Sequence, residues 1–259
     1  MPKITIYESD LTGSQYTGDE IVVFLPGNCT IVAGKEDTNG CTLIPERVDV
    51  SKYLTKDSLN PDGSYGYAET LVKKGFQVLY YSGTANNALF GQSWLKDKNQ
   101  YNIKYLTTGT QGSLAEGDED PASVCNAMIT LCKDRMDCIA LIDTLATSNF
   151  ATYDTLLAAV QKIEDEEGRA ALFADWGYID EAKKVKMPGS YFYLSALGDS
   201  VNAGKKWDAI AGVKRGVVTD FVAPVSLNLS KYDLDNNVLD FSTESRRSYN
   251  GIVAIRPYG

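Results

Sequence analysis

The chain has 259 residues, 44% of them hydrophobic and 23% charged, which is enough for one large domain or two modest ones with a real core. The net charge of −9 argues against a nucleic-acid groove, and no apolar run approaches the ~18 residues that a membrane span needs. The sequence contains no histidine, so the commonest general base and metal ligand is missing, together with every triad that uses imidazole.

The N-terminal residues 1–20 predict an extended arm. Hydrophobic and polar side chains alternate in its first part and give way to a polar run that is too short to form a core. The alternating residues are Ile4, Thr5, Ile6 and Tyr7. Residues 21–63 then predict a small β-rich segment, with strands at 21–25, 29–33 and 41–44 separated by turn residues.

Residues 64–216 alternate between helical and strand patterns and predict an α/β core. The expected helices cover 65–74 (with Ser64 as N-cap), 89–98, 120–135 and 152–167, and the expected strands cover 76–81, 103–107, 138–142 and 170–173. The run Cys138–Ile142 is continuously apolar, which is typical of a strand covered on both faces. We therefore predict a mixed sheet flanked by helices, with 138–143 as an interior strand. Residues 217–259 predict a β-containing C-terminal segment with short strands at 217–222 and 251–256.

The cysteines and the helix after residue 120 indicate packing rather than chemistry. Cys125 and Cys132 lie seven residues apart, so on a helix they share one face with Met128. The five cysteines include no C-x-x-C pair, and the N-terminus lacks the pattern of a signal peptide. We therefore expect reduced thiols and no zinc site.

The nearest approach to a metal motif lies at residues 233–244. Four ligand positions of a calcium loop are filled, by Asp233, Asp235, Asn237 and Glu244. Val238 occupies the position where such a loop needs glycine for its sharp turn, so we interpret the segment as a polar turn.

Other candidate motifs fail in similar ways. The run 198–200 (Gly-Asp-Ser) resembles an esterase nucleophile block but has no histidine to activate it, and the run 204–206 (Gly-Lys-Lys) has the wrong spacing for a phosphate loop. The acidic run 116–120 favours the start of the following helix. We predict no catalytic residue, no metal and no cofactor, so the chain is not expected to be an enzyme. A serine–lysine dyad or a pair of carboxylates that meet only in space stays open.

The last third of the sequence resembles a segment of contractile phage tail sheath proteins. Residues 207–216 are similar to the family pattern W-x-A-P-A-G-x-x-R-G, with Ile210 in place of the proline. The matching residues of this sheath-like motif are Trp207, Ala211, Gly212, Arg215 and Gly216. Residues 133–143 are similar to the helix-to-strand passage of the family's central domain, and residues 227–256 are similar to its following stretch, although Asn250 precedes the glycine there.

This resemblance implies a structural subunit of a contractile tail sheath. Such subunits polymerise helically around the tail tube and contract to drive it through the host envelope, for DNA ejection in a phage. The implied partners are other sheath subunits, the tail tube protein, the baseplate and the tail terminator, without nucleic-acid binding or membrane insertion. The implied location is the tail of a virion or phage-tail-like particle assembled in the bacterial host cytoplasm. An open helical stack needs heterologous interfaces, and the resemblance suggests Ile4–Tyr7 as a strand donated to a neighbour.

The resemblance also bears on the C-terminal end of the sequence, and it leaves other functions open. The family normally continues through a W-G-x-R-T segment into a C-terminal domain, whereas this sequence stops at Tyr258-Gly259, so we expect that domain to be absent. The alternative functions are a histidine-free α/β enzyme or ligand-binding domain of unknown substrate, and an adaptor or terminator protein with the sheath fold.

Overall fold

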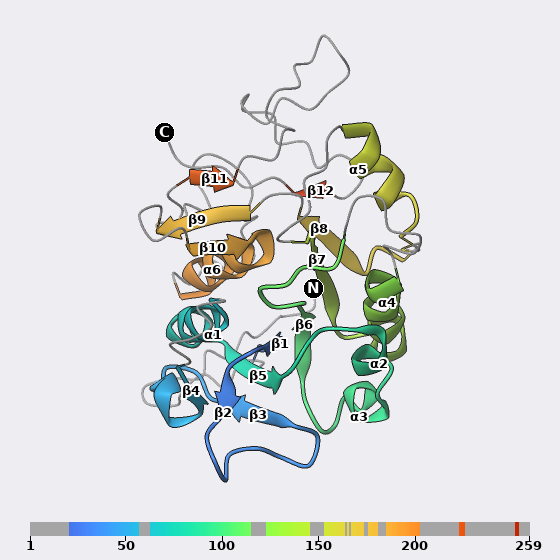
Figure 1. Cartoon of the computed structure of the whole chain (residues 1–259). Coiled ribbons are helices and arrows are strands. Elements are labelled where there is room, and N and C mark those ends of the chain that lie inside the picture. The colour runs from blue at the N-terminus through green and yellow to red at the C-terminus, as the bar shows by residue number, and fades with distance from the viewer. Residues whose placement is uncertain are drawn as a thin grey trace, which may run out of the picture.

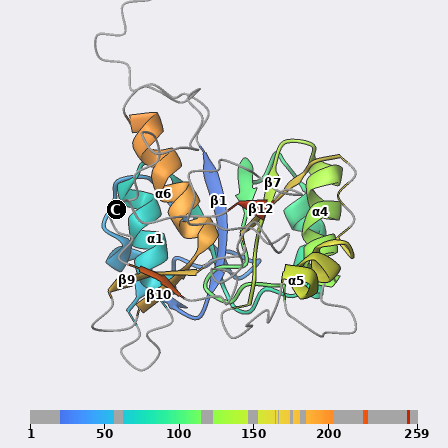
Figure 2. The ribbon, with the colours of Figure 1, turned by 90° about the horizontal axis from the view of Figure 1, so that it is seen from above.

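The described part of the chain forms a sheet between two layers of helices (Figure 1). The computed structural model describes residues 21–56, 63–114, 123–145, 153–163, 165, 167–173, 176–180, 185–202, 223–225 and 252–253. In the view from above, α1 and α6 lie on one side of the sheet and α4 and α5 on the other (Figure 2). The predicted arm, residues 1–20, lies outside the described residues.

The central sheet has seven strands in the order β12-β8-β7-β6-β1-β5-β3. They are β1 (Val22–Gly27), β3 (Cys41–Ile44), β5 (Gln77–Ser82), β6 (Ile103–Leu106), β7 (Ile139–Asp143), β8 (Ala170–Phe173) and β12 (Ile252–Val253). Every neighbouring pair is parallel except β3 and β5, which run antiparallel at one edge. This arrangement confirms the predicted fold class, an α/β protein with a mixed sheet flanked by helices.

The helices divide between the two faces of the sheet, and small strands surround them. One face carries α1 (Ser64–Lys73) and α6 (Gly189–Asn202), and the other carries α2 (Asn87–Phe90), α3 (Ser93–Lys96), α4 (Ser123–Arg135) and α5 (Tyr153–Val160). Outside this body lie η1 (Val50–Lys52), the pair β2 (Thr30–Ile31) and β4 (Leu54–Thr55), and an antiparallel sheet of β9 (Trp176–Asp180), β10 (Val185–Pro188) and β11 (Ala223–Val225). No helix in the described residues has both the length and the apolar character needed to cross a bilayer.

The core follows the two-residue period of the strands. In β1, Phe24 packs against the α2–α5 side while Val23 and Leu25 pack against the α1 and α6 side. β7 alternates in the same way, with Ile142 on the first side and Leu141 on the second. Each such large apolar side chain contributes about 1.5–3 kcal/mol when fully buried. β7 lies between β6 and β8, which confirms the predicted interior strand.

Several helix boundaries differ from the prediction. The expected helix 89–98 is two short helices, because α2 ends at the Gly91 C-cap and α3 starts anew at Ser93. The expected helix 152–167 ends at Val160, and Asp165 instead accepts hydrogen bonds from the amides of Arg169 and Ala170 in the turn before β8. Ser64 is the first residue of α1 rather than its N-cap, and Gly63 caps the helix with a positive φ of 82°.

Residues 21–63 are more closely joined to the core than the sequence suggested. They supply β1, whose six residues are all buried in the middle of the sheet, and the edge strand β3. Likewise β12, from the segment 217–259, pairs with β8. The segment between 64 and 216 therefore does not complete the sheet by itself, while the domain boundaries stay a prediction.

Candidate functional site

The residues singled out from the sequence lie outside the part of the chain that the structure describes. These are the arm residues Ile4, Thr5, Ile6 and Tyr7 and the sheath-like motif Trp207, Ala211, Gly212, Arg215 and Gly216. The calcium-like segment 233–244 and the acidic run 116–120 also lie outside it. Within the described ranges, no three His, Cys, Asp or Glu residues are grouped so that they could hold a metal ion.

Two polar clusters lie at opposite ends of β7. At its carboxyl end, Asp143 faces the first turn of α6, and its Oδ1 accepts a hydrogen bond of 2.9 Å from the amide of Ser190. The Ser190 hydroxyl also lies 2.9 Å from the hydroxyl of Tyr67 on α1. We call these three buried residues the Asp143 cluster. It joins β7 to both helices on one face of the sheet.

The loop after β6 closes the space beside this cluster. Gly109 and Gly112 adopt positive φ there, and a Cβ on Gly112 would lie 2.1 Å from the carbonyl oxygen of Thr144. The indole nitrogen of Trp176 donates to that same oxygen over 2.9 Å. Carboxyl ends of parallel strands are where α/β folds commonly bind ligands. Here the backbone approaches so closely that Asp143 is 0% exposed.

Burial determines the protonation of Asp143. Removal from water raises its pKa to about 7, although hydrogen bonds from Ser190 and Gly189 at the α6 N-terminus act in the opposite direction. Its Oδ2 has no hydrogen-bond partner, which is costly for an ionised carboxylate. Burial also raises the pKa of Tyr67 well above its usual value, so this hydroxyl stays neutral. The cluster can therefore exchange one proton near neutral pH while it holds α6 against the sheet.

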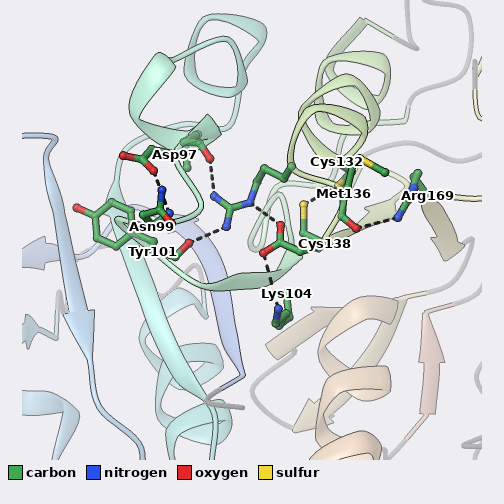
Figure 3. Close-up of polar contacts among 11 residues, drawn as sticks. Asp97, Asn99, Tyr101, Lys104, Cys132, Met136, Cys138 and Arg169 are labelled. Atoms are coloured by element: carbon green, nitrogen blue, oxygen red, sulfur yellow. Dashed lines mark hydrogen bonds and ion pairs between the residues drawn. The ribbon is translucent and has the colours of Figure 1, made fainter.

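The second cluster lies at the amino end of β7 and centres on the buried Arg135, and its members Tyr101 and Lys104 are labelled in Figure 3. The Arg135 side chain is 0% exposed. Its two terminal nitrogens donate to the carbonyl oxygens of Leu95 (2.7 Å) and Tyr101 (2.6 Å), and its Nε donates to Asp137 (3.2 Å). Lys104 of β6 lies 3.7 Å from the same carboxylate. We call these five residues the Arg135 cluster.

The Arg135 cluster joins three separate segments of the chain. The planar guanidinium matches the positions of two carbonyl groups and one carboxylate, which a lysine could not reproduce. A buried charge is tolerated when it is paired and hydrogen-bonded, and each of the three guanidinium nitrogens of Arg135 has an acceptor. The cluster therefore fixes the end of α4, the end of α3 and the start of β6 relative to one another.

Sequence reasoning named neither cluster, although signals for both were present. Arg135 lies three and seven residues after Cys132 and Met128, so it continues the apolar face of α4 instead of its exposed face. Asp143 directly follows the buried run of β7, at the carboxyl end of a parallel strand. The contact between Asp143 and α6 could not be anticipated because 47 residues separate the partners.

We expect Arg135→Ala to destabilise the protein strongly. The substitution leaves the carbonyl oxygens of Leu95 and Tyr101 without this donor, removes the hydrogen bond to Asp137 and opens a cavity, so the free energy of unfolding should fall by about 3–5 kcal/mol. Lys104→Ala is the matched control, because a partly exposed ion pair contributes less than about 1 kcal/mol. Urea unfolding followed by circular dichroism measures both. Equal losses in the two variants would contradict this assignment.

We also expect Asp143 to make stability depend on pH. Its folded pKa of about 7 lies above the unfolded value near 3.9, so the folded state holds the proton more tightly. Stability should therefore fall as pH rises from about 4 to about 7 and level off above that, by on the order of a few kcal/mol in total. Asp143→Asn should flatten this fall.

The control for this measurement is Asp49→Asn. Hydrogen bonds from Ser51 lower the pKa of Asp49 below its usual value, so its titration lies below the same pH window. Urea unfolding from about pH 4 to about pH 8 should show the wild-type slope in this control and a reduced slope in Asp143→Asn. An unchanged slope in Asp143→Asn would show that another group titrates.

Comparisons with known proteins identify the fold but no family. No family model and no curated protein matches the chain. Among solved structures, a chain of the anti-feeding prophage baseplate matches with a TM-score of 0.51 and 12% identity, over 87% of this chain and 59% of that one. A chain of the anti-feeding prophage helical sheath in its contracted state matches with a TM-score of 0.50 and 13% identity, over 87% and 58%. The chain thus spans less than two thirds of either neighbour and shares its fold with components of a contractile particle.

Proposed function

We propose that this protein is a structural subunit of a contractile tail, and specifically a sheath subunit that polymerises helically around a tail tube and contracts. The fold likeness to the contracted sheath chain, over 87% of this chain, is the observation that carries the proposal. The resemblance of residues 207–216 to a sheath segment supports it independently, because it rests on sequence. The similar score of the baseplate chain makes a baseplate subunit the nearest variant of the same proposal.

The described body has properties that suit this role. Contraction of a sheath is a reorientation of near-rigid subunits between two packings, so each subunit must keep its internal structure while its contacts change. The Arg135 cluster fixes elements on one side of the sheet, and the Asp143 cluster fixes α6 on the other. Arg135 and all three residues of the Asp143 cluster are buried, so their contacts do not depend on neighbouring subunits.

The proposed partners are other copies of this chain, a tail tube protein, a baseplate and a tail terminator. The proposed location is the tail of a virion or tail-like particle assembled in the host cytoplasm, with DNA ejection as the outcome if the particle is a phage. No catalytic residue, cofactor, nucleic acid or membrane insertion enters this proposal. The sheath-like motif Trp207–Gly216 belongs to it as a segment for mutational tests.

The decisive test is the position of the chain in a particle. Antibodies against the body, residues 64–202, should label the shaft of tail-like particles from the source organism along its full length in negative-stain images. Label restricted to one end of the shaft would assign the chain to the baseplate or terminator. Intact tails without any label would overturn the proposal of a tail component.

The arm carries the second part of the proposal, strand donation by Ile4–Tyr7. A donated strand forms backbone hydrogen bonds with the edge of a neighbouring sheet, each worth about 0.5–1.5 kcal/mol net. Ile4→Pro together with Ile6→Pro removes two amide donors, so we expect shorter or fewer tubes in images of particles assembled from the variant. Thr5→Val keeps the backbone amide and is the control. Normal tubes with both prolines would exclude this segment as the donated strand.

One observation favours the alternative of a ligand-binding domain. Asp143 lies at the carboxyl end of a parallel strand and beside a helix N-terminus, which is the usual position of ligands in α/β folds. Its complete burial argues against this use, because α6 or the loop after β6 would have to move before any ligand could reach it. In the labelling experiment, a ligand-binding domain predicts unlabelled particles.

A further inference from the structure

Two of the five cysteines face each other at the amino end of β7. Cys132 lies in the last turn of α4 and Cys138 directly precedes β7, and their sulfur atoms are 3.2 Å apart (Figure 3). The other cysteines have different neighbours: Cys29 faces Ser64, Cys41 faces the carbonyl of Asn39, and Cys125 faces Ser113. Cys132 and Cys138 are thus two described cysteines whose thiols face each other directly.

The surroundings of this pair differentiate the two sulfurs. Hydrogen bonding with Cys132 lowers the pKa of Cys138, and the nearby Arg135 guanidinium acts in the same direction against burial. Hydrogen bonding to Cys138 and burial raise the pKa of Cys132. Cys138 is therefore the sulfur that more readily becomes a thiolate, and the thiolate is the nucleophile in thiol–disulfide exchange.

The turn between the two cysteines offers a route for reagents. Both sulfurs are buried in the closed structure, but Met136 between them is 71% exposed and has a positive φ of 61°. Its carbonyl oxygen accepts a hydrogen bond of 3.2 Å from the guanidinium of Arg169. A left-handed conformation is unfavourable for methionine, so the backbone is strained at the exposed residue between the two cysteines.

We propose that Cys132 and Cys138 are a reversible dithiol–disulfide pair that closes when the protein meets a small-molecule disulfide. The Cys138 thiolate attacks one sulfur of the oxidant, whose S–S bond breaks and releases the first thiolate. The Cys132 sulfur then loses its proton, attacks Cys138 in the mixed disulfide and releases the second thiolate. In total, two protein thiols lose two protons and two electrons, and the oxidant is reduced to two thiols.

The bond would link the end of α4 to the start of β7, immediately beside Arg135. For the bond to form, the sulfur atoms need to approach from 3.2 Å to a bond length of about 2.05 Å. The pair would remain reduced in a reducing cytoplasm and close in an oxidising medium. This inference does not depend on the proposed function, because it concerns only the chemistry of the folded chain.

The test uses the folded chain and 4,4′-dithiodipyridine, a neutral disulfide that releases a coloured thiopyridone. We expect a fast phase that releases two thiopyridones per chain and lowers the protein mass by two hydrogens, without a retained adduct. Trypsin cuts after Lys133 and Arg135, so peptides 105–133 and 136–162 should remain joined until a reductant is added. Reaction only at the rate of global unfolding, or stable adducts on both cysteines, would overturn the proposal.

Alanine variants identify the sulfurs, since peptide 105–133 also contains Cys125. Cys125→Ala, in the same helix, should keep the joined peptides, whereas Cys132→Ala should give a lasting adduct on Cys138. If the joined peptides disappear in Cys125→Ala, the bond forms between Cys125 and Cys138, and the proposal is wrong. Oxidation should raise the melting temperature of the wild type by roughly 5 °C and that of Cys132→Ala not at all. If a variant folds poorly, fragmentation of the joined wild-type peptides in the mass spectrometer still shows whether Cys132 or Cys125 is bonded to Cys138.

Discussion

A strand in the middle of a parallel sheet, covered by helices on both faces, has only its two ends available for polar groups. β7 is such a strand: β6 and β8 pair with its edges, and the two helical layers cover its faces. Its interior residues, such as Leu141 and Ile142, are consequently apolar and buried. The same constraint places Arg135 and Asp137 before the strand and Asp143 at its last position. The polar clusters of this protein therefore follow from the burial of one strand.

The two buried ionisable groups at the ends of β7, Arg135 and Asp143, are accommodated in different ways. At the amino end, Arg135 finds two carbonyl groups and a carboxylate, so the charged form is kept by direct hydrogen bonds. At the carboxyl end, Asp143 has amide donors for one oxygen but none for the other. The effect of burial on its pKa is therefore larger than that of the hydrogen bonds, and the carboxyl group keeps its proton until the pH reaches about 7. One end is a permanent connection, and the other weakens when its proton is lost.

The sequence allowed the layers to be predicted, but not the contacts between them. The apolar run 138–142 predicted β7 because double-sided burial leaves a local signature in the residues themselves. The central place of β1 was missed, since Val22 pairs with Gln77 and Ile103, which lie 55 and 81 residues later, and such pairing depends on packing rather than on local pattern. α5 was predicted too long for a related reason: the apolar period continues to Ile163, but Asp165 binds the backbone before β8 and ends the helix early. The Asp143 and Arg135 clusters join residues distant in sequence, so only their individual members carried a signal.

A helical assembly that contracts needs subunits that stay rigid and contacts between subunits that can change. If every subunit must move relative to its neighbours without unfolding, its internal contacts must be stronger than the contacts that are exchanged. In the described residues the strong contacts are internal and buried: the two-sided core, the guanidinium of Arg135 and the link from Asp143 to α6. Ion pairs at the surface, such as Lys96 with Asp134 and Lys73 with Glu69, contribute little to this rigidity because water screens them. Exposed charges of this kind can exchange partners at small cost, which suits the proposed role in a contractile tail, where the surface of a subunit would be repacked against its neighbours.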